Sequence, residues 1–316
     1  MGRRPRPKGP VHDAVLVVDK PAGPTSHDVV ARVRRAVGHS RVGHTGTLDP
    51  PATGVLVLCL GRATKLVRFL QAGTKTYAAR IQLGVTTDTQ DAEGRVLATV
   101  DADHLDEHTV CEAFTAFQGS FEQLPPMVSA VKVGGERLHA KARRGETVDR
   151  EPRQVHVGSL VLDGFTPGAI AEVSVLLTCS AGTYVRTIAH DVGQRLGVGG
   201  SLVSLRRVAN GPFTLEEAVG LDVIEEGGAA AVEGASVDVL TAVTRTLEVV
   251  EVGDDEVARR ITQGGAGPAV DHEGSVALVR PAAPERNAQL LAIARSNADR
   301  DATRPELVWT RPEELT

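Results

Sequence analysis

The chain has 316 residues, of which 41% are hydrophobic and 24% charged. At roughly 150 residues per domain, this length predicts two globular domains. No run of about 18 uncharged apolar residues occurs, which argues against a membrane-spanning helix. Met1–Pro10 is rich in arginine and proline, and no apolar signal region follows it. We therefore expect residues 1–10 to be a disordered basic tail on a cytoplasmic protein.

Charge is distributed unevenly along the chain. The net charge is −5, yet residues 1–80 carry 14 Lys and Arg against 4 Asp and Glu, whereas residues 211–316 carry 9 against 20. A protein can hold an anionic polymer on a basic face while its remainder stays acidic. By itself the asymmetry leaves two interpretations equally open: nucleic-acid binding, and a merely solvated charge imbalance.

The first elements are a strand and an amphipathic helix. Val15–Asp19 is a short apolar run typical of a strand. Ser26 is a candidate N-cap for a helix in which valines recur at helical spacing between Val29 and Val37. Gly38 then ends this helix.

A loop and three regular elements come next. Gly43–Pro50 is rich in glycine and has neither helical nor strand periodicity, so it predicts a loop. Gly54–Leu60 is a continuous apolar strand. Thr76–Leu83 alternates, with Tyr77 among the residues on its apolar face. Asp106–Gln118 has the pattern of a helix.

The middle of the chain combines an insertion with further strands and a helix. Leu124–Arg153 predicts a protruding insertion, with a short strand at Val128–Val133 and a basic helix at Glu136–Arg144. The elements expected after it are strands Gln154–Leu162 and Glu172–Cys179 and a helix from Gly182 to about Leu196. Strands and helices mix throughout, which indicates an α+β or mixed α/β class.

The character of the sequence changes near Leu247. Beyond it, short apolar runs alternate with glycine and proline turns. This pattern predicts a small, mostly β second domain over residues 247–316, after a first domain over residues 11–246. The apolar runs are Leu247–Val252, Ser275–Val279, Leu290–Ala294 and Leu307–Thr310.

Asp49 is the first candidate for chemistry. It lies in a loop of Gly, Thr and Pro residues, and Pro50 pushes it out of helical dihedral angles. A fixed backbone around a reactive carboxylate is what positioning of a substrate requires. The alternative is a turn aspartate that bonds to its own backbone. Residue pattern alone favours that alternative.

Tyr77, Tyr184 and Arg186 are the next candidates. The chain has only two tyrosines, and an aromatic ring at a pocket edge can stack on a nucleobase. Arg186, at the start of a predicted helix, could bind a carboxylate through two parallel hydrogen bonds. Spacing alone favours the alternative that both tyrosines are core residues with satisfied hydroxyl groups.

Metal and nucleotide-phosphate chemistry find little support. His44 has no second histidine or acidic residue at metal spacing, and no Cys-x-x-Cys pair occurs. The glycines of Gly43–Gly46 could suggest a phosphate loop, but no Gly-Lys-Ser/Thr follows. We therefore expect neither a bound metal nor a nucleotide hydrolase.

Several longer strings resemble the TruB family of pseudouridine synthases, in the family's order along the chain. They cover roughly Val15–Val208. The strings are Asp19–Ser26 (DKPAGPTS), Gly43–Leu56 (GHTGTLDPPATGVL), Lys75–Tyr77 (KTY), Cys179–Thr187 (CSAGTYVRT) and Leu202–Arg207 (LVSLRR). Pro125–Lys132 and Leu138–Gly145 are similar to the family's RNA-clamping insertion.

The resemblance implies a function and a role for each matching residue. The function is isomerisation of uridine 55 in the T-loop of tRNA to pseudouridine, with Asp49 as the catalytic carboxylate. Whether Asp49 attacks the ribose, attacks the base or abstracts a ribose proton stays open. The implied substrate-binding residues are Tyr77, Arg186, Leu205, His44, Tyr184 and Lys20. Tyr77 would stack on the extruded base, Arg186 would pair with Asp49, and Leu205 would form a wall of the pocket. His44 would fill the space that the base leaves in the T-loop, and Lys20 with Pro21 would support the catalytic loop.

The resemblance also implies a fold and a set of partners. The expected fold is α+β, with a mixed, mainly antiparallel sheet and a small PUA-like carboxy-terminal domain. Because the carboxy-terminal domain is acidic, we expect it to have a minor role in binding phosphates. The expected partner is the T-arm of tRNA, bound by a monomer without cofactor. A non-catalytic tRNA-binding or tRNA-folding protein and a guide-RNA-dependent synthase remain alternatives.

Overall fold

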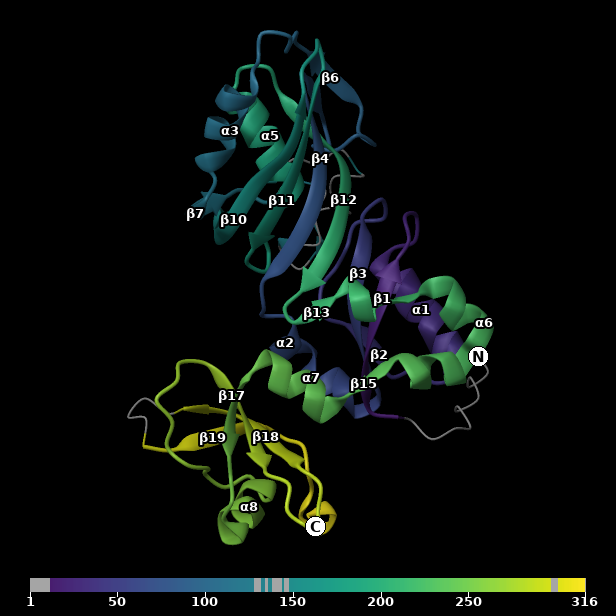
Figure 1. Ribbon diagram of the computed structural model, residues 1–316, viewed down its shortest axis with the longest axis vertical. Coiled ribbons are helices and arrows are strands. Elements are labelled where there is room, and N and C mark those ends of the chain that lie inside the picture. Colours follow the sequence, from purple (N-terminus) through teal and green to yellow (C-terminus); the bar gives the residue numbers. More distant parts are fainter. Residues whose placement is uncertain are drawn as a thin grey trace.

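The fold is built on one large sheet with helices on both sides, followed by a small second sheet (Figure 1). The computed structural model describes residues 12–127, 132–133, 136–137, 144, 148–296 and 301–315. The expected basic tail and half of the expected insertion lie outside these residues. Where the structure describes the insertion, Lys132–Val133 (β8) pairs with Glu136–Arg137 (β9), so residues 136–137 form a strand instead of the predicted start of a helix.

The large sheet has eleven strands and is mainly antiparallel, as expected. Among the described residues, two of its strand pairings, β1 with β14 and β3 with β12, are parallel and the others antiparallel. Three short strands pair at its margin: β2 (Val42–His44) with β3, β13 (Phe213–Thr214) with β12 and β15 (Ser236–Asp238) with β1. The main order is β14 (Val219–Gly220), β1 (Ala14–Lys20), β3 (Thr53–Leu60), β12 (Gly200–Asn210), β4 (Lys75–Leu83), β11 (Ala171–Cys179), β10 (Arg153–Thr166) and β7 (Gly119–Gln123).

The half of the sheet formed by β4, β11 and β10 buries one face. Alternate residues of β4 from Tyr77 to Leu83 are buried, whereas Ala78 and Arg80 are exposed. The buried face packs against α3 (Glu107–Thr115) and α5 (Val185–Arg195). This is the pattern of an antiparallel sheet with one wet side, and it confirms the predicted alternation.

The other half of the sheet is buried on both faces. Val15 and Val17 of β1 face one hydrophobic cluster, and Leu16 and Val18 face another. Helices α1 (Ser26–Ala36) and α6 (Leu221–Ala235) cover the second of these faces, and α7 (Val239–Thr246) packs against the first. Double burial explains why β1 and β3 are continuous apolar runs instead of alternating ones.

The second, smaller sheet follows α7 and is mostly β, as expected. Its strands are β16 (Glu248–Glu251), β17 (Ser275–Arg280), β18 (Gln289–Ser296) and β19 (Thr303–Val308), with α8 (Asp255–Thr262) beside them. Apolar residues of β17 and β18 join the same hydrophobic cluster as β1 and α7. Arg62 also lies against the Trp309 ring, 4.8 Å from its centroid. The two sheets are therefore joined by a continuous apolar contact.

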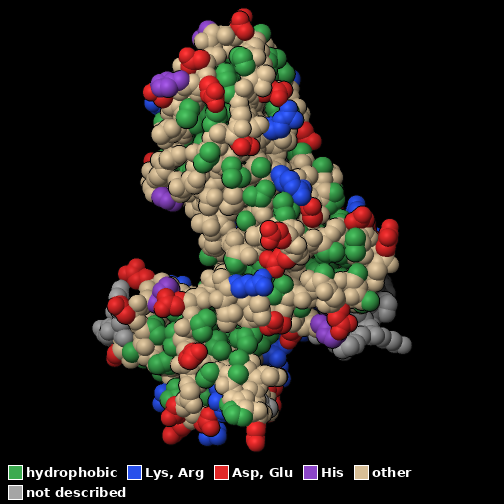
Figure 2. Space-filling model, in the orientation of Figure 1, with side chains coloured by type: hydrophobic (Ala, Val, Ile, Leu, Met, Phe, Trp, Pro, Cys, Tyr) green, Lys and Arg blue, Asp and Glu red, His purple; other side chains and the backbone are tan. Residues whose placement is uncertain are grey.

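Shorter elements complete the chain. A hairpin of β5 and β6 precedes α3, and 3-10 turns and one short helix connect the longer elements. Their bounds are β5 Val85–Thr87, β6 Val96–Thr99, α2 Val67–Leu70, η1 Gly61–Leu66, η2 Leu215–Glu217 and η3 Pro312–Glu314. On the face in Figure 2, acidic and basic side chains are interspersed over both parts of the molecule. In the part of the chain that the structure describes, no helix combines the length and apolarity needed to cross a membrane.

Helix α1 begins one residue earlier than expected. Its N-cap is Thr25, whose hydroxyl accepts a hydrogen bond from the Asp28 backbone, while the Asp28 carboxylate accepts one from the Thr25 backbone. This is a capping box. Ser26 is thus the first helical residue, and its hydroxyl is free to contact another part of the chain.

Candidate active site

A cavity of about 250 Å³ lies where the loop after β2 meets the start of α5. Its walls come from five regions distant in sequence: the loop, the end of α2, β4, the segment before α5 with the first turn of α5, and β12. The lining residues are Gly46, Thr47, Leu48, Asp49, Gln71, Lys75, Tyr77, Ala181, Gly182, Thr183, Tyr184, Val185, Arg186, Leu202, Leu205 and Arg207. Five of the seven predicted site residues are among them: Asp49, Tyr77, Tyr184, Arg186 and Leu205.

Asp49 faces this cavity from a loop held at several points. The Ser26 hydroxyl donates to the Leu48 carbonyl oxygen at 3.1 Å and accepts from the Leu48 amide at 2.8 Å. The Pro50 carbonyl accepts a hydrogen bond from the Gly23 amide at 2.8 Å. Leu48 is buried, whereas the Asp49 side chain is 48% exposed. The loop backbone is therefore fixed while the carboxylate stays open to a ligand.

Lys20 supports the same loop from behind. Its side chain is fully buried, and its ammonium group donates to the carbonyl oxygens of Pro21, Pro50 and Ala52 at 3.0, 3.0 and 2.6 Å. Lys20 is not among the residues that line the cavity. This position is compatible with the supporting role that the family resemblance implies. It does not place Lys20 in direct contact with a substrate in the cavity.

Burial lowers the pKa of Lys20 to about 8, although the nearby Asp49 carboxylate partly opposes this shift. Between pH 8 and 10.5 the unfolded chain therefore binds more protons at this lysine than the folded chain. The contribution of Lys20 to the free energy of unfolding therefore rises with pH in this window. We expect the difference in unfolding free energy between wild type and Lys20→Met, measured by urea denaturation, to increase from pH 8 to pH 10. The exposed Lys65→Met should show no such trend, and parallel pH profiles for wild type and Lys20→Met would contradict the prediction.

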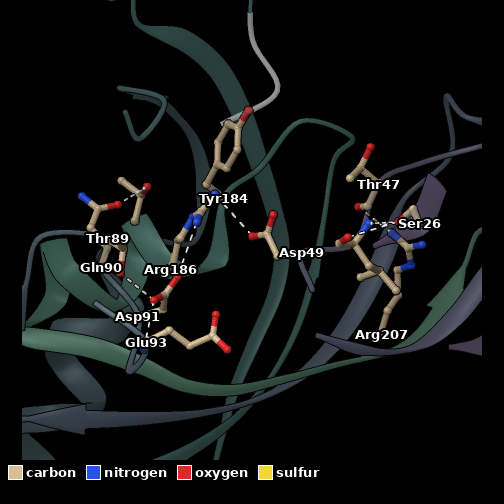
Figure 3. Close-up of polar contacts among 12 residues, drawn as sticks. Ser26, Thr47, Asp49, Thr89, Gln90, Asp91, Glu93, Tyr184, Arg186 and Arg207 are labelled. Atoms are coloured by element: carbon tan, nitrogen blue, oxygen red, sulfur yellow. Dashed lines mark hydrogen bonds and ion pairs between the residues drawn. The ribbon is translucent and has the colours of Figure 1, made fainter. Parts of the chain in front are cut away.

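Arg186 links two carboxylates at the wall of the cavity (Figure 3). Its Nη2 lies 3.3 Å from the Asp49 Oδ2, and its Nη1 lies 3.5 Å from the Asp91 Oδ2. The Arg186 side chain is only 6% exposed and that of Asp91 16%, so both groups are largely shielded from water. A planar guanidinium presents donors in a fixed fork, which suits this bridging position.

Asp91 is a site residue that sequence reasoning missed. The Asp91 Oδ1 accepts hydrogen bonds from the Thr89 hydroxyl at 2.6 Å and from the Glu93 amide at 3.2 Å. Gln90, just before it, adopts a left-handed backbone conformation with φ 66°. Its side chain accepts a hydrogen bond from the Thr187 hydroxyl at 2.9 Å. These contacts fix Asp91 beneath Arg186.

Tyr77 and Arg207 form the floor of the cavity. They lie opposite each other on β4 and β12. Burial raises the pKa of the Tyr77 hydroxyl, although the Arg207 guanidinium opposes this shift. Burial also lowers the pKa of Lys75, beside them, to about 8, and Arg207 adds to that shift. The cavity floor is thus a neutral phenol among cationic groups.

Arg207 is a second site residue whose role the sequence did not reveal. Its side chain is fully buried and donates to the carbonyl oxygens of Val55 at 2.6 Å and Gly46 at 3.3 Å. Gly54 permits this close approach, because a Cβ there would lie 2.2 Å from the Arg207 carbonyl oxygen. Gly54 also has φ +97°, which favours glycine. Arg207 therefore ties β12 to the loop that carries Asp49.

Tyr184 is the N-cap residue of α5 and is held by Gln123. Both ends of the Gln123 amide are used: its oxygen accepts from the Tyr184 amide at 2.8 Å, and its nitrogen donates to the Tyr184 carbonyl at 3.0 Å. The helix begins at Val185, later than the predicted start at Gly182, because Tyr184 has an extended backbone. Leu205 on β12 adds an apolar wall to the cavity.

His44 does not line the cavity that contains Asp49. It ends β2 and borders a second hollow of about 450 Å³, together with His27, Arg34 and Arg41. Burial lowers the pKa of His44 to about 4, and His27 and Arg207 add to the shift. The ring is therefore neutral at physiological pH. Within the described ranges, no group of three His, Cys, Asp or Glu side chains is arranged to hold a metal ion.

The chain matches two protein-family models and several named relatives. Residues 34–185 match the family model described as the N-terminal domain of the TruB family pseudouridylate synthases. Residues 186–250 match the model of the tRNA pseudouridylate synthase B C-terminal domain. A protein of Thermobifida fusca named tRNA pseudouridine synthase B is 45% identical over 90% of this chain and 95% of its own length. One of Symbiobacterium thermophilum with the same name is 52% identical over 69% of this chain and 73% of its own length.

Solved structures show the same fold. The crystal structure of a Cbf5-Nop10-Gar1 complex contains a chain that superposes with a TM-score of 0.72 at 26% identity. The match covers 96% of this chain and 86% of that one. Taken with the family models and the relatives of 45–52% identity, it confirms the resemblance seen in the motifs. The chain belongs to the TruB family of pseudouridylate synthases.

Proposed function

We propose that this protein converts uridine 55 in the T-loop of tRNA to pseudouridine, with Asp49 as the catalytic carboxylate. The observation that carries the proposal is the half-exposed Asp49 carboxylate, which faces a cavity and lies 3.3 Å from the Arg186 guanidinium. The names of relatives at 45% and 52% identity support tRNA as the substrate class.

The chemistry requires only groups that the cavity supplies. In this isomerisation the bond from the ribose C1′ to N1 of the base breaks, and a bond from C1′ to C5 forms. The hydrogen on C5 leaves as a proton, and N1 gains one, so no oxidant or nucleotide is consumed. A fixed carboxylate can assist the first step if the nucleotide is held against it. Arg186 would hold the Asp49 carboxylate in place beside the reacting sugar.

The cavity suits a single extruded nucleoside. Its volume of about 250 Å³ is just below the ~300–1,000 Å³ typical of sites for drug-sized ligands. A base must leave its stack to enter, at a cost of a few kcal/mol. Stacking on the Tyr77 ring can offset part of this free-energy cost, since stacking of a base on an aromatic ring contributes ~1–3 kcal/mol. The apolar side chain of Leu205, which also lines the cavity, would help to exclude water.

The expected organisation and partners form part of the proposal. Residues 11–246 would form the catalytic domain, with residues 124–153 as the RNA-clamping insertion, and residues 247–316 would form the PUA-like domain. The protein would act in the cytoplasm as a monomer on the T-arm of tRNA, without cofactor. Because the second sheet shares a hydrophobic cluster with β1 and α7, we propose that it stabilises the catalytic domain more than it binds phosphates.

A hairpin assay tests the function. The purified protein alone is incubated with an unmodified T-arm hairpin, and pseudouridine is mapped by carbodiimide-dependent stops of reverse transcription. We expect one stop, at the uridine equivalent to position 55, and none when that uridine is replaced by cytidine. A non-catalytic RNA-binding protein would bind the hairpin without product. A guide-RNA-dependent synthase would give no product until its partners were added.

A further inference from the structure

The first two residues of α1 contact the two ends of the segment from His44 to Leu48. Ser26 holds the Leu48 backbone through two hydrogen bonds, directly before Asp49. The neighbouring His27 ring contacts the His44 ring edge to face, with centroids 5.2 Å apart and an interplanar angle of 79°. Farther along the helix, the Arg34 guanidinium donates to the Val42 carbonyl at 2.7 Å. One rigid helix therefore sets both the loop backbone and the orientation of His44.

The contact between the rings differs from the two backbone contacts. His27 is exposed in the first turn of α1 and supports neither the capping box nor the core of the helix. His44 is half-buried at the end of β2, and its rotation is restricted by whatever packs against its ring. Edge-to-face pairs of aromatic rings have a preferred geometry and a modest energy. His27 thus contributes little to the stability of the fold, and the main contact of its ring is with His44.

The rings share a hollow that carries positive charge at its rim. His27 and His44 line it together with Arg34 and Arg41, and it has no lining residue in common with the cavity of Asp49. A nucleic-acid strand whose target nucleotide enters the Asp49 cavity would continue past His44, only five residues away along the loop. A flat, uncharged ring is suited to contact with a nucleobase, and arginines beside it are suited to the phosphate backbone.

We propose that His27 is a positioning residue that fixes the ring of His44 against the RNA next to the extruded nucleotide. The inference rests on the proposed function and adds to it a determinant of RNA affinity outside the catalytic cavity. His27 acts through His44, so its removal should weaken binding of the RNA and leave the chemical step at Asp49 nearly unchanged.

The experiment compares steady-state kinetics of wild type, His27→Ala and His27→Phe on the T-arm hairpin. The hairpin carries tritium at C5 of uridine, which is released as pseudouridine forms. For His27→Ala we expect KM to rise roughly two- to tenfold, the range given by loss of an aromatic pair, with kcat within about twofold. His27→Phe keeps an aromatic ring and should restore KM to within about twofold of wild type. The control His108→Ala removes an exposed histidine distant in sequence and should change neither constant.

A double-mutant cycle separates positioning from a structural effect. If His27 acts only through His44, the variant His27→Ala/His44→Ala should have the same KM as His44→Ala alone. Additive effects of the two substitutions, or an unchanged KM in His27→Ala, would overturn the inference while leaving the proposed function intact. Absence of product from wild type would instead overturn both. Thermal unfolding midpoints of all variants should agree with wild type within a few degrees.

Discussion

Replacement of Asp49 by asparagine is expected to abolish pseudouridine formation while hairpin binding persists. Asparagine has nearly the same shape as aspartate but cannot act as an anionic nucleophile or base. Removal of a group that takes part in bond breaking lowers rates by several orders of magnitude, so we expect a fall in kcat of at least about 10⁴-fold. The Asp49 side chain is 48% exposed and supports no core packing, so the fold should be unaffected.

Tritium release and filter binding on the same hairpin measure the two effects separately. The dissociation constant of Asp49→Asn should stay within about threefold of wild type, because the loop backbone is held by Ser26 and Lys20 and not by this carboxylate. Asp163→Asn changes an exposed aspartate on β10 and serves as the matched control, with wild-type activity expected. Product formation by Asp49→Asn within a hundredfold of the wild-type rate would remove Asp49 from its role.

Local patterns in the sequence predicted the strands better than the chemistry. Alternation in β4 and the unbroken apolar run of β3 gave the correct elements, because burial on one or two faces imposes those patterns directly. The predicted N-cap of α1 was one residue too late, because Thr25 and Ser26 are both good N-cap residues. Only Thr25 has an acidic residue three positions later, Asp28, so the capping-box rule would have decided between them.

The helices α6 and α7 had no clear signal. Two adjacent glycines interrupt the helical periodicity of α6, and Gly228 has non-helical angles that kink it. The strand β2 was hidden as well, because Val42–His44 is short and lies in a glycine-rich segment. Elements of this kind form because neighbouring strands and helices pack against them, and that information is not local in sequence.

The candidate site depended on family resemblance and on long-range contacts. Spacing could not distinguish Asp49 from an ordinary turn aspartate, whereas the matching motifs named it as a candidate together with Tyr77, Arg186 and Leu205. Asp91 and Arg207 escaped notice because their partners are remote: Arg186 is 95 residues from Asp91, and Arg207 contacts Gly46 from 161 residues away. A polar loop aspartate and an inward-facing strand arginine have no recognisable local pattern until the fold joins them.

Arg186→Lys is expected to lower kcat by about two to three orders of magnitude, the effect typical of losing one preorganised donor in an active site. Lysine keeps the positive charge but carries it on a single nitrogen. It cannot place one donor 3.3 Å from Asp49 and another 3.5 Å from Asp91. The Asp49 carboxylate would then lose its fixed orientation toward the substrate. Asp91→Asn, which keeps an acceptor for Thr89 but loses its charge, should give a smaller decrease of roughly tenfold.

Single-turnover rates at saturating hairpin test this ordering, because they report the chemical step without the contribution of binding. The matched control is Arg80→Lys, since Arg80 pairs with Glu172 at 2.7 Å on the exposed face of the sheet. Exposed ion pairs contribute little, so this variant should keep the wild-type rate. A rate for Arg186→Lys within threefold of wild type would show that a point charge is sufficient beside Asp49. Equal losses in Arg186→Lys and Asp91→Asn would show instead that the carboxylate of Asp91, and not the guanidinium fork, sets the geometry of the pair.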